Sequence, residues 1–526
     1  MKWQNLLVRT LKKSYRRIIL IVADGWGVAP DGPGNYVKKS KTPVYNQLLK
    51  EYPHCINKAC GNAVGLPEGS QGNSEVGHLH LGAGRIVWQP LELINRSIRD
   101  GSFFKNKTFL KLMERVRKNN SSLHITGLCS DEGVHAHINH LFALLELSRK
   151  MGLKKVYIHF IADGRDVPER SAKKYVKMIE KKCSEFGIGE IVTLIGRYYS
   201  MDRDNNWDRT KKAYEMLTLG EGFRSKNAIE GIEMAYRRGD KTDYYIQPTV
   251  IREYGTVKDG DGLIFFNFRT DRPRQLTQAF ISKKFDKFER KVHPRVYFVT
   301  MTEYDKRFGK IYAFREQIVK NHLGEFLSKK GLKQLRIAET EKYAHVTYFF
   351  NGQIEKEYPG EERIMIPSPK VPSYDMKPEM SANEVAEKAV EQISTKKFDF
   401  ILINFANCDL VGHSAKKAAI IKAIETVDKC VGKVVESGLR NNYTIILTAD
   451  HGSVEDKLYP NGDPKPSHST NPVNFFVISK DEDLKNISLR NGEMKDVAPT
   501  ILEIMGFKKP KEMTGESLIT PFKFYK

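Results

Sequence analysis

Three apolar runs of this 526-residue chain each end in a cluster of aspartate or of aspartate with histidine. The clusters are Asp24, Asp409 with His413, and Asp450 with His451. Carboxylate oxygens and imidazole nitrogens together are donors that divalent transition metals accept. The residue types therefore predict metal-assisted chemistry at one site assembled from distant parts of the chain.

The apolar runs must be the elements that position these clusters. They span residues 18–23, 400–405 and 443–448 and are rich in isoleucine. Runs this short predict buried parallel strands rather than amphipathic helices. Open α/β sheets bind ligands past the carboxyl ends of their strands, so we expect all three clusters at one sheet edge.

The clusters divide into two candidate ligand sets. The sets are Asp24, Asp450 and His451, and Asp409, His413 and His468. The four-residue spacing of Asp409 and His413 would put both on one face of a helical turn. A lone aspartate or histidine in a loop is usually solvated or capping, but three strand-end clusters favour ligands. Two close metals can clamp a phosphoryl group and lower the pKa of an oxygen nucleophile.

Ser74 is the candidate nucleophile. It lies in Gly69-Ser-Gln-Gly-Asn-Ser74-Glu-Val-Gly-His78, where a loop is expected to enter a helix. The simpler interpretation of such a serine is an N-cap. The functional interpretation is an activated hydroxyl at a helix N-terminus, where the helix dipole also favours a phosphate.

The middle of the chain carries arginines just past predicted strands. Arginine binds phosphate and carboxylate groups bidentately, so an anion pocket is favoured over surface salt bridges with neighbouring aspartates. Arg269 and Arg272 are three residues apart and would share a face if their segment is helical. The pocket candidates are His135, Arg165, Asp166, Arg197, Arg203, Arg269 and Arg272.

Composition fits a globular protein of more than one domain. Hydrophobic residues make up 40% and no run reaches the roughly 18 apolar residues of a membrane span. The net charge of +22 would suit a nucleic-acid-binding protein. Because the lysines are dispersed and no binding motif accompanies them, we favour a solvated basic surface that steers an acidic substrate. Six cysteines without a paired framework fit a reducing compartment.

Alternating strand and helix patterns predict an α/β fold of two domains. A discontinuous metal-binding domain with a parallel-rich sheet is expected at residues 1–89 and 310–526. An inserted α/β domain, which carries the arginines, is expected at residues 90–309. The basic segment Met1 to Arg17 could be a transit peptide, but we favour an extension that leads into the first strand.

The segments that carry these residues resemble cofactor-independent phosphoglycerate mutases of the alkaline phosphatase superfamily. The resemblance runs from about Arg16 to near Ile519. It rests on ordered motifs, which are Asp24-Gly-Trp-Gly, Gln71-Gly-Asn-Ser-Glu-Val-Gly-His, Asp163-Gly-Arg-Asp, Gly196-Arg-Tyr-Tyr, Ala338-Glu-Thr-Glu-Lys-Tyr-Ala-His-Val-Thr and Thr448-Ala-Asp-His-Gly.

The resemblance implies two divalent metal ions, manganese first, with zinc, cobalt or magnesium as alternatives. One implied ligand set is Asp409, His413 and His468, and the other is Asp24, Ser74, Asp450 and His451. Ser74 would be the phosphorylated nucleophile, and Asp166 would handle a proton or anchor a hydroxyl. The implied substrate-binding residues are His135, Arg165, Asp166, Arg197, Arg203, Arg269, Arg272 and Lys342.

The implied activity is an isomerase that interconverts 3-phosphoglycerate and 2-phosphoglycerate without bisphosphoglycerate. Alternatives are a metal-dependent phosphatase or a phosphopentomutase of the same superfamily and, outside enzymes, a nucleic-acid-binding protein. We expect a cytoplasmic monomer with no specific nucleic-acid or membrane partner. Cys408 stands where the family usually has proline, and it is either a soft ligand that favours zinc or, as we prefer, a buried spacer.

Overall fold

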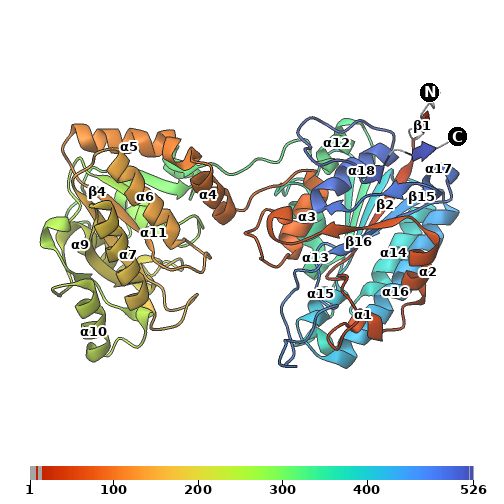
Figure 1. Ribbon diagram of the computed structural model, residues 1–526, viewed down its shortest axis with the longest axis horizontal. Coiled ribbons are helices and arrows are strands. Elements are labelled where there is room, and N and C mark those ends of the chain that lie inside the picture. The colour runs from red at the N-terminus through yellow and green to blue at the C-terminus, as the bar shows by residue number, and fades with distance from the viewer. Residues whose placement is uncertain (1–6, 10–14, 521, 525–526) are drawn as a thin grey trace, which may run out of the picture. The chain divides into compact units, whose positions relative to one another are not determined.

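The computed structural model describes residues 7–9, 15–520 and 522–524. The chain forms two compact units (Figure 1). The first unit comprises Met1–Trp88 and Gln317–Lys526, and the second comprises Gln89–Glu316. The division expected after residue 309 falls before β11 (Tyr312–Phe314), which pairs with β10 (Tyr297–Thr302) of the second unit. The second crossing therefore follows Glu316.

The basic N-terminal segment is described only in part, because residues 1–6 and 10–14 lie outside the described ranges. Of its described residues, Leu7–Arg9 form β1, which pairs antiparallel with β20 (Phe522–Phe524), and Arg17 begins β2 (Arg17–Ala23).

An eight-stranded sheet forms the centre of the first unit. In spatial order its strands are β13 (Glu361–Ile366), β12 (Gln334–Glu339), β14 (Phe400–Phe405), β2 (Arg17–Ala23), β15 (Tyr443–Thr448), β16 (Val473–Ile478), β3 (His54–Lys58) and β18 (Gly492–Glu493). The strands β14, β2 and β15 are adjacent, parallel and almost wholly buried. This confirms the strands expected from the isoleucine-rich runs, which are covered on both faces.

The register of these strands brings their polar ends to one edge. Ala23 pairs with Phe405, and Val22 pairs with Thr448. The residues that follow β2, β14 and β15 therefore emerge side by side. Because β16 runs antiparallel to β15, the loop before β16, which carries His468, reaches the same edge.

Helices cover both faces of this sheet. The long helix α16 packs against α14, and α3 packs against α18 (Figure 1). The helices of the first unit are α1 (Tyr36–Lys39), α2 (Pro43–Glu51), α3 (Ser74–Ala83), α12 (Leu323–Lys329), α13 (Thr340–Ala344), α14 (Ala382–Ser394), α15 (Asn407–Gly412), α16 (Lys417–Arg440), α17 (Glu482–Lys485) and α18 (Val497–Ile504).

The second unit is built on its own eight-stranded sheet, parallel except where β8 meets β6. In spatial order the strands are β11, β10, β9 (Gly262–Phe265), β4 (Leu123–Leu128), β5 (Val156–Ala162), β6 (Glu190–Gly196), β8 (Thr249–Val250) and β7 (Phe223–Arg224). Its helices are α4 (Pro90–Arg99), α5 (Lys107–Lys118), α6 (Ile138–Lys150), α7 (Ala172–Phe186), α8 (Arg197–Ser200), α9 (Trp207–Leu219), α10 (Ala228–Arg238) and α11 (Arg274–Ile281). Across the described ranges of both units, no helix has the length and apolar character needed to cross a membrane.

Candidate active site

The carboxyl edge of the first sheet gathers Asp24, Asp409 and Asp450 around His451. The Nε2 atom of His451 lies 3.4 Å from Asp24 Oδ1, 3.7 Å from Asp409 Oδ1 and 3.8 Å from Asp450 Oδ2. All four residues are buried. Burial favours the neutral imidazole, but Asp450, Asp24 and Asp409 outweigh it and raise the pKa of His451 to about 10.

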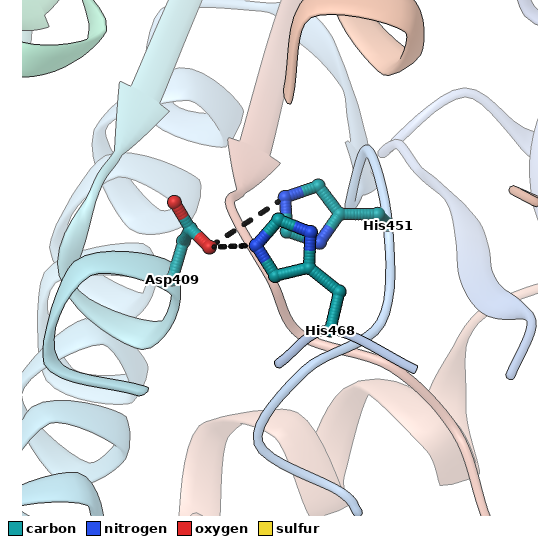
Figure 2. Close-up of side chains that lie close together, drawn as sticks. All are labelled: Asp409, His451 and His468. Atoms are coloured by element: carbon teal, nitrogen blue, oxygen red, sulfur yellow. Dashed lines mark ion pairs between the residues drawn. The ribbon is translucent and has the colours of Figure 1, made fainter. Parts of the chain in front are cut away.

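Asp409 is the centre of one candidate ligand group, with His451 and His468 (Figure 2). Its Oδ1 lies 2.9 Å from His468 Nε2 and 3.3 Å from His413 Nε2. His413 follows the last residue of α15, so the helical turn expected between it and Asp409 is present. Burial alone would raise the pKa of Asp409, but Lys342 and the neighbouring imidazoles hold it well below its ordinary value.

The second candidate ligand group comprises Asp24, Asp450 and a residue that the sequence did not single out, His78. His78 Nδ1 lies 3.2 Å from Asp450 Oδ2. Asn404, in β14, donates from Nδ2 to Asp24 Oδ2 at 2.8 Å and to His78 Nε2 at 3.1 Å. His78 and Asn404 thus link the carboxylates of Asp450 and Asp24 through a chain of polar contacts. The motif Ser74-Glu-Val-Gly-His78 placed His78 one helical turn after Ser74, which was the available signal.

The donors at this edge fit divalent cations. Asp409 Oδ1 and Asp450 Oδ2 are buried and accept no well-formed hydrogen bond. A buried carboxylate oxygen that accepts no hydrogen bond is costly, and a cation held between these two oxygens and the neighbouring imidazoles would offset that cost. The mixture of oxygen and nitrogen donors suits manganese, cobalt or zinc better than calcium.

Ser74 points its hydroxyl into this cluster. The N-cap of α3 is Asn73, whose side chain accepts from Val76 N at 3.1 Å, so the capping interpretation of Ser74 is wrong. Ser74 Oγ lies 3.1 Å from both Asp24 Oδ1 and His451 Nε2. Because Asn73 takes the cap, the hydroxyl of the first helical residue remains available to the site.

Lys342 enters the same cluster from α13. Its Nζ donates to Ser74 Oγ at 2.6 Å, to Asp409 Oδ2 at 2.5 Å and to Asp24 Oδ1 at 3.0 Å. Burial opposes the charge on Lys342, but Asp24 and Asp409 outweigh it and raise its pKa above the ordinary value. The ammonium therefore stays charged beside the serine oxygen.

Cys408 precedes Asp409 and is fully buried. Burial and the nearby Asp24 and Asp409 carboxylates raise the pKa of its thiol well above the ordinary value. A protonated thiol is a poor metal ligand, which favours the buried-spacer interpretation.

The second unit holds a buried arginine between two carboxylates. Arg197 Nη1 donates to Asp163 Oδ1 at 2.6 Å and to Asp166 Oδ2 at 2.5 Å. Asp163 also accepts from Ser130 Oγ at 2.7 Å and from the main-chain N–H of Arg165 at 3.2 Å. The side chain of Arg165 is exposed. Asp163, which the sequence did not select, fixes the loop that carries Arg165 and Asp166.

His135 stands beside this arginine. Its Nε2 lies 3.9 Å from Asp166 Oδ2, and its Nδ1 lies 3.8 Å from Asp271 Oδ1. Burial and Arg197 lower the pKa of His135 to about 4. His135 is therefore neutral near pH 7, and its buried Nδ1 makes no hydrogen bond.

The remaining arginines of the second unit differ in exposure. Asp271 accepts from Arg203 at 2.8 Å and pairs with Arg269 at 3.3 Å, and both arginine side chains are more than two-fifths exposed. Arg272 is buried and donates to Met201 O at 3.1 Å. The condition for a shared helical face at Arg269 and Arg272 is not met, because α11 begins only at Arg274.

In comparisons with known proteins, each of the two units matches a protein-family model. The family "BPG-independent PGAM N-terminus" matches residues 94–306, and the family "Sulfatase" matches residues 366–507. The 2,3-bisphosphoglycerate-independent phosphoglycerate mutase of Moorella thermoacetica is 49% identical over 96% of this chain and 98% of its own length. The 2,3-bisphosphoglycerate-independent phosphoglycerate mutase of Acetivibrio thermocellus is 50% identical over 95% of this chain and 99% of its own length.

The chain belongs to the 2,3-bisphosphoglycerate-independent phosphoglycerate mutase family. A solved structure of Leishmania mexicana phosphoglycerate mutase at low cobalt concentration is also similar, with a TM-score of 0.64 and 30% identity over 98% of this chain and 100% of that one. As a phosphoglycerate mutase, the chain is an isomerase that interconverts 3-phosphoglycerate and 2-phosphoglycerate. The match of residues 94–306 lies within the second unit, so the family assignment covers that unit as well as the first.

Proposed function

We propose that the interconversion of 3-phosphoglycerate and 2-phosphoglycerate proceeds through a phosphoserine on Ser74. The observation that carries the proposal is the position of Ser74 Oγ, which is hydrogen-bonded to Lys342 and surrounded by the Asp24 and His451 ligand atoms. Ser74 Oγ gives up its proton and attacks the phosphorus of 3-phosphoglycerate. The bond from phosphorus to the 3-oxygen breaks, and that oxygen takes up one proton and leaves as the hydroxyl of glycerate. Lys342 supports the charge that develops on the serine oxygen.

The second half of the reaction returns the phosphoryl group to the glycerate. The 2-hydroxyl attacks the phosphoserine, the bond from phosphorus to Ser74 Oγ breaks, and 2-phosphoglycerate forms. No bisphosphoglycerate is consumed, because the phosphoryl group stays on the enzyme between the two steps. Asp166 is assigned the transfer of a proton or the anchoring of a glycerate hydroxyl. We assign the binding of the substrate's carboxylate and hydroxyl groups to residues of the second unit, which are His135, Arg165, Arg197, Arg203, Arg269 and Arg272.

Two divalent ions, manganese first, are proposed for the first unit. Asp409, His413 and His468 would hold one, and Asp24, Ser74, Asp450 and His451 the other. Bound there, the ions would supply Lewis-acid stabilisation of the phosphoryl oxygens and lower the pKa of the serine hydroxyl. We further propose that the enzyme acts as a monomer in the cytoplasm.

Ser74→Ala tests the proposal directly. We expect mutase activity without added bisphosphoglycerate to fall to the assay background while the fold and metal content persist, because the acceptor oxygen is removed. Ser70→Ala, in the same loop, is the matched control and should keep full activity. Mass spectrometry of native enzyme, denatured at neutral pH in the presence of substrate so that phosphohistidine would also survive, should find phosphate on Ser74. Phosphate on a histidine, or mutase activity in Ser74→Ala, would contradict the proposal.

A further inference from the structure

The carboxylate of Glu455 joins three loops of the first unit. The side chain is only 2% exposed. Its Oε2 accepts from the main-chain N–H groups of Gly27 at 3.0 Å and Ser453 at 2.8 Å. Its Oε1 accepts from Asn471 Nδ2 at 3.1 Å and from the hydroxyl of Ser469. Both oxygens are thus fully used by donors from distant parts of the sequence.

Each of these loops carries a proposed metal ligand. Gly27 follows β2 in the loop of Asp24, Ser453 follows β15 in the loop of His451, and the third loop is that of His468. The Glu455 carboxylate therefore holds together, at fixed separations, backbone segments whose side chains converge on the same cluster. The donors that it accepts from are two main-chain N–H groups and the side chains of Ser469 and Asn471, none of which is a proposed ligand atom.

The chain makes room for this carboxylate with two glycines. A Cβ atom on Gly27 would lie 2.3 Å from Glu455 Cδ, and one on Gly452 would lie 2.3 Å from Ser469 Oγ and 2.5 Å from Glu455 Oε1. None of these distances is compatible with a side chain. The close approach of Glu455 thus explains the final glycine of Asp24-Gly-Trp-Gly27, and Glu455 together with its partner Ser469 explains that of Asp450-His-Gly452.

We infer that Glu455 is a positioning residue that sets the geometry of the metal-binding loops. The inference rests on the proposed metal ligands. Partners of this kind orient ligand groups without touching the metal, and their loss commonly lowers metal affinity about 10–100-fold. Glu455 does so by anchoring loop backbones, so its removal should loosen three ligand-bearing segments at once.

The test measures manganese affinity of the full-length chain by calorimetry after metal removal, together with thermal unfolding of the metal-free protein. Glu455→Leu removes every acceptor and should weaken binding about 10–100-fold. Glu455→Gln should weaken it less, because the amide oxygen can still accept from the two main-chain N–H groups. The matched control is Asp428→Asn: Asp428 is 2% exposed and accepts from the N–H groups of Val44 and Tyr45, in a segment that carries no proposed ligand. The control should lower stability and leave the affinity unchanged.

The outcomes distinguish a failure of the positioning role of Glu455 from a failure of the proposed metal-ligand assignment. Native-like affinity in both Glu455 variants would overturn the positioning role, as would an equal loss of affinity in Asp428→Asn. Failure of the native chain to bind manganese, zinc or cobalt would overturn the metal assignment instead. If Glu455→Leu does not fold, Glu455→Gln decides: an affinity below native with near-native unfolding supports the inference, and a native affinity rejects it.

Discussion

Replacing Arg197 by methionine should destabilise the second unit as well as abolish turnover. The guanidinium is buried between Asp163 and Asp166, with contacts of 2.6 and 2.5 Å. Removing one partner of a buried ion pair costs about 3–5 kcal/mol, because the other charge remains unpaired. Asp163 would keep its bonds from Ser130 and from main-chain N–H groups. We therefore expect a loss near the lower end, about 3 kcal/mol.

Adding Asp163→Asn to Arg197→Met tests the cause of that loss. With the unpaired Asp163 carboxylate neutralised, stability should recover by about 1–2 kcal/mol. Mutase activity should stay lost, because the cation proposed to bind the substrate is still absent. Urea unfolding followed by tryptophan fluorescence suits the measurement, since Trp207 lies in the second unit. If Arg197→Met lowers the free energy of unfolding by less than about 1 kcal/mol, the ion pair of Arg197 with Asp163 and Asp166 is screened by solvent. If adding Asp163→Asn restores no stability, the unpaired-charge explanation is refuted.

Three further predictions follow from the same geometry. Chelation should abolish activity, and activity should fall in acid, because the ligand imidazoles must be neutral to bind metal; full turnover in a chelated, metal-free sample would contradict this. Arg272→Ala should impair kcat/KM more than Arg269→Ala, since Arg272 is buried and tethered to Met201 O, with metal content unchanged in both; unchanged kinetics would make the arginines a surface network. Burial lowers the pKa of His140 to about 3, so the unfolded chain binds more protons below pH 6.5 and stability should fall by about 2 kcal/mol from pH 7 to 5. Urea midpoints should show this slope, and His140→Gln should flatten it.

The sequence was sufficient for the elements that carry the chemistry. The runs that became β2, β14 and β15 were recognisable because strands buried on both faces are continuously apolar, and an aspartate within four residues after each run marked the edge. The sequence also contained the signal against a helix at Arg269 and Arg272. Arg272 precedes Pro273, and the residue before proline disfavours the α conformation, which explains why α11 begins at Arg274.

The parts that the sequence did not reveal depend on tertiary placement. Asn404 sits inside an apolar strand, and nothing local shows that its amide bonds both Asp24 and His78. Asp163 and Glu455 belong to recognisable motifs, yet their function is to accept hydrogen bonds from loops far away in the chain. Such residues are identified by the donors around them, and those donors are brought together only by the folded sheet.

The partition of ligands between two ions is the clearest case of this limit. Sequence order placed His451 with Asp450, its neighbour in the chain. In space its Nε2 lies within 3.4–3.8 Å of Asp24, Asp409 and Asp450 alike, and the carboxylates raise its pKa together. Neighbouring ligands along a chain need not serve the same ion, because a strand end directs successive side chains to different sides. Measuring the number of metal ions bound by His451→Ala and by His413→Ala would therefore show which ion each histidine holds, which the spacing in the sequence does not show.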